Sequence, residues 1–185
     1  MASRRSVTPL DPTAIARLRA ADFTYSGVGA TKIQFPVGYH HARREVSVGA
    51  GERRLRDLGE AILGWQVQLG SGLRVASSAP RVDTDEVALV GIGLGPLQVM
   101  APVRVVYVID EPGQRYGFAY GTLPGHPVAG EEMFCVERQP DDTIVFVVTA
   151  FSRPDTLLTK VAGPMGRIGQ RVMAARYIRA MRYWH

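Results

Sequence analysis

Apolar and polar positions follow two spacings along this chain, which predict helices toward both ends and strands between them. Asp11 followed by Pro12 indicates a helix start, because the carboxylate caps the first turn and proline suits that turn. Apolar residues recur at helical spacing from Glu52 to Leu63, which predicts a second helix that Gly64 ends. The same spacing predicts a long final helix from Met165 to about Tyr183.

Runs of β-branched and aromatic residues fill the middle of the chain. They predict strands at 66–69, 73–76, 86–94, 103–109, 116–122, 132–138 and 143–151. Gly70, Ser71 and Gly72 are expected to form a hairpin turn between the first two of these strands. After the last strand, the segment Ser152-Arg-Pro-Asp155 is typical of a helix start with a capping box.

These elements together predict an α+β fold. Since short turns join successive strands, we expect a curved antiparallel β-sheet wrapped around the long C-terminal helix, with short N-terminal helices. A length of 185 residues suits one domain, so a single domain over residues 1–185 is expected. A sheet that wraps a helix leaves a gap where apolar side chains do not fully meet, and such gaps are common ligand cavities. We therefore expect a cavity between sheet and helix.

Composition places the chain among globular proteins. Hydrophobic residues make up 46% and charged residues 21%, and no apolar run is long enough to cross a bilayer. Pro9, Asp11 and Pro12 stand where a signal peptide needs an apolar stretch, so we expect a cytoplasmic protein without integral membrane association. The single cysteine, Cys135, excludes an intramolecular disulfide and a thiolate metal cluster, and it is expected to be buried rather than nucleophilic.

The charge is only moderately basic, with a formal net value of +5. A solvated surface accounts for the arginine clusters at 43–44 and 53–56 at least as well as nucleic acid does, and no nucleic-acid motif is present. Nucleic acid is therefore not an expected partner. His40 and His41 would point to opposite faces of a strand, with no Asp or Cys nearby at ligand spacing, so we expect no metal and no cofactor.

The most informative segment runs from Arg115 to Glu132 and combines aromatic residues, glycines, one histidine and two adjacent carboxylates. A strand would place Tyr116, Phe118 and Tyr120 on one face, while the prolines of the following Leu-Pro-Gly-His-Pro sequence must leave the sheet because they lack a ladder donor. The segment therefore predicts a site where polar groups converge at a rigid turn beside an aromatic strand.

Two residues of this segment are candidate acid/base groups, His126 and Glu132. The ordinary pKa of histidine, near 6.5, suits general acid/base catalysis, although the ring could instead hold its own turn by bonding the backbone. Glu132 shares a strand face with apolar residues and is expected to point inward, whereas Glu131 would face solvent or pair with an arginine. Arg176 or Arg179, which fall within the apolar arc of the final helix, could pair with Glu132 as a structural salt bridge or a catalytic one.

Further candidates would line the cavity and bind a ligand. Tyr116, Tyr120 and Thr122 share the face of Phe118, so their hydroxyl groups could orient a ligand carbonyl or hydroxyl, or the rings could simply form core. Among these, Tyr120 is also the candidate hydrogen-bond donor to a developing oxyanion. Tyr25 and Trp65 are expected to close the cavity from the helical side.

The same residues resemble the signature of a family found in bacteria and plants, domain-of-unknown-function family 1990. The resemblance is carried by residues 116–127 with Gly130-Glu131-Glu132, by Tyr25-Ser-Gly-Val-Gly-Ala-Thr31, by Ala150-Phe-Ser-Arg-Pro154 and by 170–180. It covers nearly the whole chain and implies an α+β fold similar to the START-like helix-grip superfamily, which includes lipid and steroid carriers and polyketide cyclases. It implies no settled activity.

Three functions remain open from the sequence. The first is binding of a hydrophobic or amphipathic small molecule in the cavity between sheet and helix. The second is an enzyme on the same cavity, a cyclase, dehydratase or isomerase of a polyketide-like substrate, with His126 or Glu132 as general acid/base. The third is an interaction module whose apolar helix face docks a partner protein. Fold analogy supports the first two equally.

Overall fold

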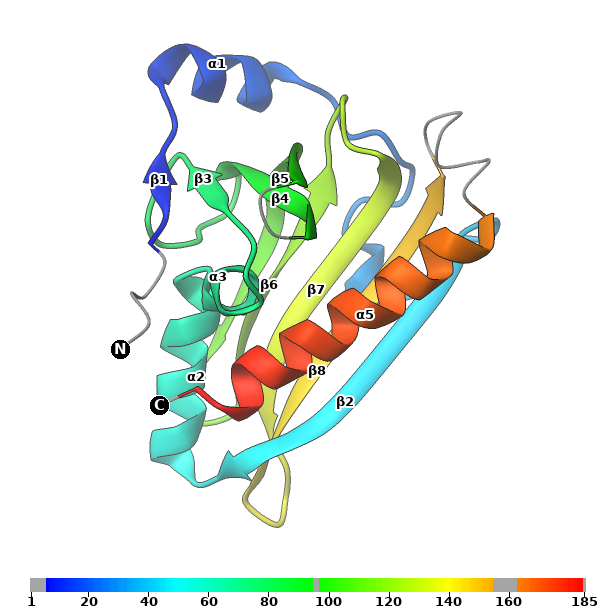
Figure 1. The fold of residues 1–185 in the computed structure, drawn as a ribbon. Coiled ribbons are helices and arrows are strands. Elements are labelled where there is room, and N and C mark those ends of the chain that lie inside the picture. Colours follow the sequence, from blue (N-terminus) through cyan, green and yellow to red (C-terminus); the bar gives the residue numbers. More distant parts are fainter. Residues whose placement is uncertain (1–5, 95–96, 155–162, 185) are drawn as a thin grey trace.

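The computed structural model describes residues 6–94, 97–154 and 163–184, which form one sheet with helices packed against it (Figure 1). The strands are β1 (Thr8–Pro9), β2 (His40–Ala50), β3 (Val75–Ser77), β4 (Val87–Leu94), β5 (Leu97–Glu111), β6 (Arg115–Thr122), β7 (Val128–Arg138) and β8 (Thr143–Pro154). They form an 8-stranded sheet in the order β1-β3-β4-β5-β6-β7-β8-β2. Every neighbouring pair is antiparallel except β1 with β3.

The longer helices pack against one face of this sheet. The helical elements are α1 (Pro12–Ala20), the 3-10 turn η1 (Ala30–Lys32), α2 (Glu52–Leu63), α3 (Gln66–Gly70) and α5 (Gly163–Arg182). Figure 1 shows α5 lying diagonally across β7 and β8, with α2 and α3 beside its C-terminal end. The α+β fold with a sheet around a C-terminal helix is therefore confirmed. Within the described part of the chain, no helix is long and apolar enough to cross a membrane.

The sequence signals at helix ends act as expected. The Asp11 side chain accepts a hydrogen bond of 2.9 Å from the backbone amide of Ala14 and so caps α1. Helix α2 covers Glu52–Leu63, and the amide of Gly64 bonds back to Glu60, which closes the last turn. The predictions of both helices are confirmed.

The segment after Gly64 is helical where strands and a hairpin were expected. Trp65 adopts a left-handed backbone conformation with φ of 62°, which turns the chain into the short helix α3. Val67 and Leu69 are both buried, and a short buried apolar run has the same pattern in a helix as in a strand. The predicted strand at 66–69 and its hairpin are therefore wrong, and the amide of Ser71 bonds to Val67 as a helix end.

Strand β2 was not predicted because it carries little apolar signal. Its only fully buried side chain is Val48, and its exposed residues include Arg43, Arg44 and Glu45. It is an edge strand that pairs with β8 along its whole length. The predicted helix start at Ser152 is also wrong over Ser152–Pro154, since these residues belong to β8, and the rest of that prediction lies outside the described residues.

The main core lies between the sheet and helices α2, α3 and α5. Its largest members are Leu55, Leu58, Ile62, Trp65, Leu69, Phe118, Tyr120, Phe134, Phe146, Tyr177 and Met181. Gly59 allows α2 to approach β6, because a Cβ there would lie 2.7 Å from the ring of Tyr116. Since side chains alternate along a strand, Cys135 lies on the opposite face in a second cluster, where it is fully buried as expected.

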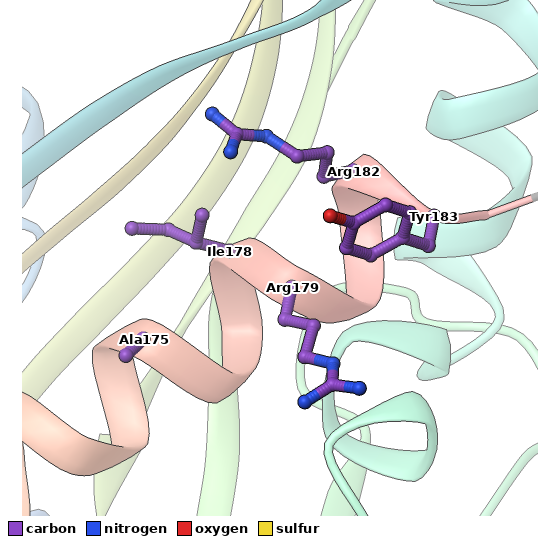
Figure 2. A pocket seen from close by; sticks show the side chains of 5 residues that line it. All are labelled: Ala175, Ile178, Arg179, Arg182 and Tyr183. Carbon is purple, nitrogen blue, oxygen red and sulfur yellow. The ribbon is translucent and has the colours of Figure 1, made fainter.

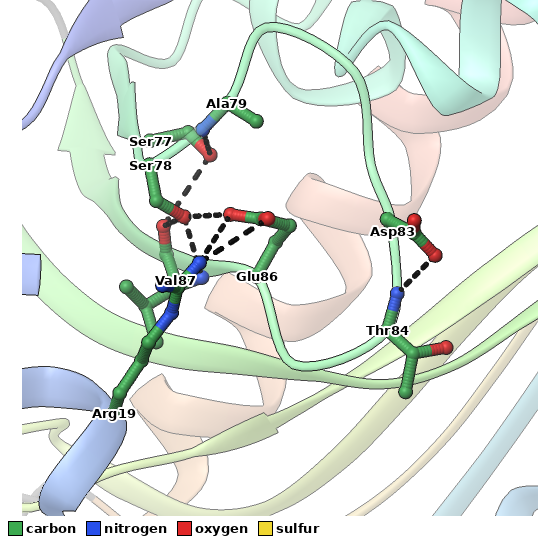
Figure 3. Close-up of polar contacts among 8 residues, drawn as sticks. All are labelled: Arg19, Ser77, Ser78, Ala79, Asp83, Thr84, Glu86 and Val87. Atoms are coloured by element: carbon green, nitrogen blue, oxygen red, sulfur yellow. Dashed lines mark hydrogen bonds and ion pairs between the residues drawn. The ribbon is translucent and has the colours of Figure 1, made fainter.

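Helix α1 is attached to the sheet through the β3–β4 connection (Figure 3). The amide of Val87 donates to the Ser78 hydroxyl oxygen at 2.9 Å, and the same hydroxyl contacts the carboxylate of Glu86. Glu86 in turn pairs with Arg19 of α1 at 3.3 Å. The polar residues of this connection therefore have a structural role, because they link α1 to the sheet.

Candidate functional site

The two adjacent glutamates of the central motif lie on opposite faces of the sheet. In the ladder between β6 and β7, Tyr120 stands opposite Glu132 and Gly121 stands opposite Glu131. Glu132 therefore shares its face with Phe134 and the helices, whereas Glu131 points away from α5. The inward orientation expected for Glu132 is what the structure shows.

Glu132 joins a hydrogen-bonded group that bridges the sheet and α5. The Tyr120 hydroxyl donates to Glu132 Oε2 at 2.8 Å. The Tyr177 hydroxyl, from α5, lies close enough to Tyr120 and Glu132 for the charge of Glu132 to raise its pKa. We call Glu132, Tyr120 and Tyr177, with the neighbouring rings of Trp65 and Phe134, the Glu132 site.

Aromatic rings surround this group. The ring of Tyr120 stacks on Trp65 with centroids 6.4 Å apart and lies 5.6 Å from Phe134. Tyr177 meets Phe134 edge-on at 5.1 Å. These rings occupy much of the space between sheet and helix in which a cavity was expected, yet Glu132 remains only half-buried beside them.

The electrostatics follow from this setting. Removal from water raises the pKa of Glu132 to about 7, although the hydrogen bond from Tyr120 lowers it in part. Burial also raises the pKa of Tyr120 and of Tyr177 well above the ordinary tyrosine value, and the charge of Glu132 raises both further. Glu132 is thus a carboxylate whose charged form lacks full compensation, and it titrates near neutral pH.

Neither of the two candidate arginines supplies that compensation, so the predicted pairing of Glu132 with Arg176 or Arg179 is wrong. Helix α5 instead turns Tyr177 toward the sheet. Arg176, the preceding residue, packs against the turn at Gly72, where a Cβ would lie 3.2 Å from its Nη2. Its Nη1 is buried without a hydrogen-bond partner among the described residues. Arg179 is exposed. No local pattern in the sequence marks Tyr177 for this role.

Arg179 lines a surface hollow of about 350 Å³ on α5 (Figure 2). The other lining residues are Ala175, Ile178, Arg182 and Tyr183. Figure 2 shows Ile178 and Arg182 along one side of the helix and Arg179 projecting from the other. Because α5 and Tyr183 provide the whole lining, this hollow is not the cavity expected between sheet and helix.

Glu131, by contrast, is 2% exposed and fully bonded by the loop after α1. Its Oε2 accepts from the Tyr25 hydroxyl at 2.8 Å and from the Gly29 amide at 2.7 Å, and its Oε1 accepts from the Thr31 amide at 3.1 Å and from the Thr31 hydroxyl. Gly121 makes room for this arrangement, since a Cβ there would lie 2.2 Å from the Tyr25 hydroxyl oxygen. We call Glu131, Tyr25, Gly29 and Thr31 the Glu131 cluster.

The Glu131 cluster corrects two expectations. Glu131 is neither in solvent nor paired with an arginine. Tyr25 does not close a cavity from the helical side, because it binds Glu131 and packs on Phe151 at 5.5 Å on the other face. Burial and the charge of Glu131 raise the pKa of Tyr25 above its ordinary value, so this tyrosine stays neutral.

The remaining candidates have mainly structural contacts. The Thr122 hydroxyl bonds the Thr24 hydroxyl at 2.7 Å and accepts from the Gly130 amide at 2.9 Å, which ties the ends of β6 and β7 together. Tyr116 lies under α2, and Phe118 is fully buried against Trp65 at 5.2 Å. Trp65 does lie on the helical side of the Glu132 site, where its Nε1 is buried and has no partner within the described part of the chain.

His126 is buried in the turn between β6 and β7. Its Nδ1 lies 2.8 Å from the Val128 carbonyl oxygen and 3.2 Å from the Val128 amide nitrogen, so one of these bonds forms in each tautomer. This contact matches the turn-holding role that the sequence left open. A catalytic role for His126 stays a prediction.

The architecture defines the class of protein as a helix-grip α+β fold. In this fold a sheet wraps a long C-terminal helix, and here a half-buried carboxylate lies between the two. The crystal structure of TTHA0849 from Thermus thermophilus shares the fold, with a TM-score of 0.53 at 13% identity over 77% of this chain and 94% of that one. The chain belongs to the family described as Domain of unknown function (DUF1990), whose model matches residues 24–180.

Two relatives extend this comparison. A UPF0548 protein of Deinococcus radiodurans is 34% identical over 96% of this chain and 95% of its own length. The UPF0548 protein At2g17695 of Arabidopsis thaliana is 29% identical over 73% of this chain and 67% of its own length. The family resemblance drawn from the motif is therefore confirmed.

Proposed function

We propose that this protein binds a hydrophobic or amphipathic small molecule between the sheet and α5, with the Glu132 site holding the polar end. The observation that carries the proposal is the state of Glu132. Its carboxylate is half-buried among aromatic rings, one oxygen accepts from Tyr120, and Oε1 has no hydrogen-bond partner within the described residues. Oε1 is not sealed from water, so it can accept a hydrogen bond from a ligand.

The fold supports the same proposal at a coarser level. The helix-grip fold is typical of proteins that bind hydrophobic small molecules, and the rings of Trp65, Phe134 and Tyr177 form an apolar cluster beside Glu132. Because these rings are closely packed, we expect a ligand to enter beside Glu132 by displacing a ring. A cytoplasmic location and a single domain stay predictions.

Native mass spectrometry of freshly purified protein tests this proposal, followed by denaturation and identification of any released small molecule. A blocking variant makes the test specific to the site. Ala150 stands opposite Glu132 in β8, so Ala150→Leu adds bulk beside the carboxylate. We expect the bound mass to be lost in this variant and kept in Glu45→Gln, which changes an exposed carboxylate. Equal occupancy in both variants would place the ligand elsewhere.

The second candidate is an enzyme that uses the same site. A carboxyl group with a pKa of about 7 is suited to proton transfer at neutral pH, and Tyr120 beside it could donate to a developing oxyanion. Under this alternative, Glu132→Gln abolishes turnover of a carbonyl substrate while affinity stays within a few-fold. A parallel loss of affinity and turnover would favour simple binding.

A further inference from the structure

We infer that the ligand presents a protonated amine to Glu132, so that the site selects amphipathic amines over neutral or acidic molecules of the same shape. This inference rests on the proposed function and names the ligand class for that site. Three observations carry it: the lack of a cation at Glu132 among the described residues, the aromatic cluster beside it, and the carboxylate oxygen Oε1, which has no hydrogen-bond partner among the described residues.

The first observation is that the described protein provides no cation to Glu132. The ion pairs among the described residues are Arg19–Glu86, Arg43–Glu45, Arg53–Asp57, Arg81–Glu60, Arg115–Glu111 and Arg138–Asp142. In the sheet, the neighbours of Glu132 are Tyr120 on β6 and Ala150 on β8, both uncharged. From the helices, Tyr177 faces it while Arg176 packs at Gly72.

The second observation is the kind of surface beside the carboxylate. Tyr120 stacks on Trp65, and Tyr177 packs against Phe134, so four aromatic rings lie within one contiguous cluster. The faces of such rings carry partial negative charge and attract ammonium groups, most strongly where water is excluded. A carboxylate within an aromatic cluster therefore offers an ammonium group both an ion pair and ring contacts.

The third observation concerns hydrogen-bonding capacity. A carboxylate accepts several hydrogen bonds, and Glu132 uses Oε2 for Tyr120. Oε1 is left for a ligand, and an ammonium group is a donor with no acceptor, which matches an oxygen that only accepts. A ligand carboxylate would instead meet the charge of Glu132 and be repelled.

The pH dependence separates an amine from a carbonyl ligand. A carbonyl needs the protonated form of Glu132 as donor, so its affinity falls as pH rises through the pKa of about 7. An amine needs the charged form, so its affinity rises through the same range and levels off until the amine itself loses its proton. For one group with a pKa of about 7, amine affinity at pH 6 should be about tenfold below that at pH 8.

The experiment uses three probes that share one ring system: 2-(2-naphthyl)ethylamine, 2-(2-naphthyl)ethanol and 2-naphthylacetate. Isothermal titration of the full chain at pH 6, 7 and 8 gives their dissociation constants. We expect the amine to bind at least tenfold tighter than the alcohol at pH 8 and to show the tenfold loss at pH 6. Glu132→Gln should remove both effects, and Glu45→Gln should keep them.

Other results separate this inference from the proposed function. Equal binding of amine and alcohol, or affinity that grows toward low pH, overturns the amine inference and leaves small-molecule binding in place. Preferential binding of the acid also overturns it and points to Arg176. Absence of binding by all three probes at millimolar concentration contradicts both proposals. Thermal melting of each variant shows whether a lost effect reflects unfolding.

Discussion

Glu131 and Glu132 are neighbours in the chain but have opposite environments. Glu131 accepts bonds from two backbone amides and two hydroxyl groups and is sealed from water. Glu132 has one hydroxyl partner and remains half-buried. Buried carboxylates with a structural role usually have all their hydrogen bonds made within the protein. A carboxylate that acts on a ligand or substrate often keeps an oxygen without a protein partner. The difference indicates a structural role for Glu131 and supports the proposed ligand-binding role of Glu132.

The largest effect on the free energy of unfolding is expected from removal of the Glu131 carboxylate. Glu131→Ala removes the acceptor of the buried Tyr25 hydroxyl and of the partly buried amides of Gly29 and Thr31. We expect the free energy of unfolding to fall by about 4 kcal/mol, as for the loss of one partner from a buried charged network. Urea denaturation measures this value. Glu45→Ala, at an exposed position, should stay within about 0.5 kcal/mol of the wild type, and a similarly small loss at Glu131 would contradict the structural assignment.

The opposite sign is expected at Glu132. The folded-state pKa of about 7 lies above the ordinary glutamate value of 4.5, so charging this group in the folded state opposes folding. Wild-type stability should therefore fall relative to Glu132→Gln as pH rises from 4.5 to 7, and the difference should stay constant above that. The variant should be more stable at pH 8 by up to about 3 kcal/mol, which is the pKa difference in energy. Denaturation at pH 4.5, 6 and 8 checks this, and a variant that is less stable at pH 8 would contradict it.

A smaller effect on stability, together with a change in the pKa of Glu132, is expected when its hydrogen-bond donor Tyr120 is changed. Tyr120→Phe removes the hydrogen bond that lowers the pKa of Glu132 and leaves the burial that raises it. We expect the pKa of Glu132 to rise above about 7, with a stability loss of about 1 kcal/mol. Carbon-detected NMR titration of the glutamate carboxyl groups follows this pKa. Tyr39→Phe changes a tyrosine on the other face and serves as the control, and an unchanged pKa in Tyr120→Phe would mean that the hydrogen bond has no electrostatic effect.

The smallest effect is expected at His126. Its ring bonds the backbone of its own turn, so His126→Ala should lower the free energy of unfolding by about 1 kcal/mol. Naphthylethylamine affinity should stay within twofold, because the contact with Val128 belongs to the turn. A tenfold loss of affinity with unchanged melting would restore His126 to the binding site.

The sequence predicted the elements whose signals are local. Asp11 caps α1, Gly64 ends α2, and the strands with alternating apolar residues lie close to their expected positions. Local signals failed where tertiary contacts decide the structure. Segment 66–69 is apolar enough for a strand, yet the left-handed Trp65 turns it into α3. Strand β2 is too polar to be recognised alone, and its position beside β8 stabilises it.

The sequence likewise predicted those features of the candidate site that depend on local pattern, and missed those that depend on tertiary contacts. The inward orientation of Glu132 and its proximity to Tyr120 follow from strand alternation and could be predicted. Its partner across the gap could not, because a small rotation of α5 decides whether Tyr177 or an arginine faces the sheet. The role of Tyr25 was hidden for another reason. Its hydrogen bond to Glu131 joins residues 106 positions apart, and no local pattern marks such a pair.

The place of β2 in the sheet also has a consequence for how the chain folds during synthesis. His40 pairs with Ser152 and Ala50 with Thr143, so β2 leaves the ribosome about a hundred residues before its partner strand β8. Pairings of such long range form slowly, and an unpaired strand can join other chains in the meantime. The exposed charged residues Arg43, Arg44 and Glu45 discourage such contacts, as charges on edge strands commonly do. The polar character that concealed β2 in the sequence thus protects the nascent chain until its last strand arrives.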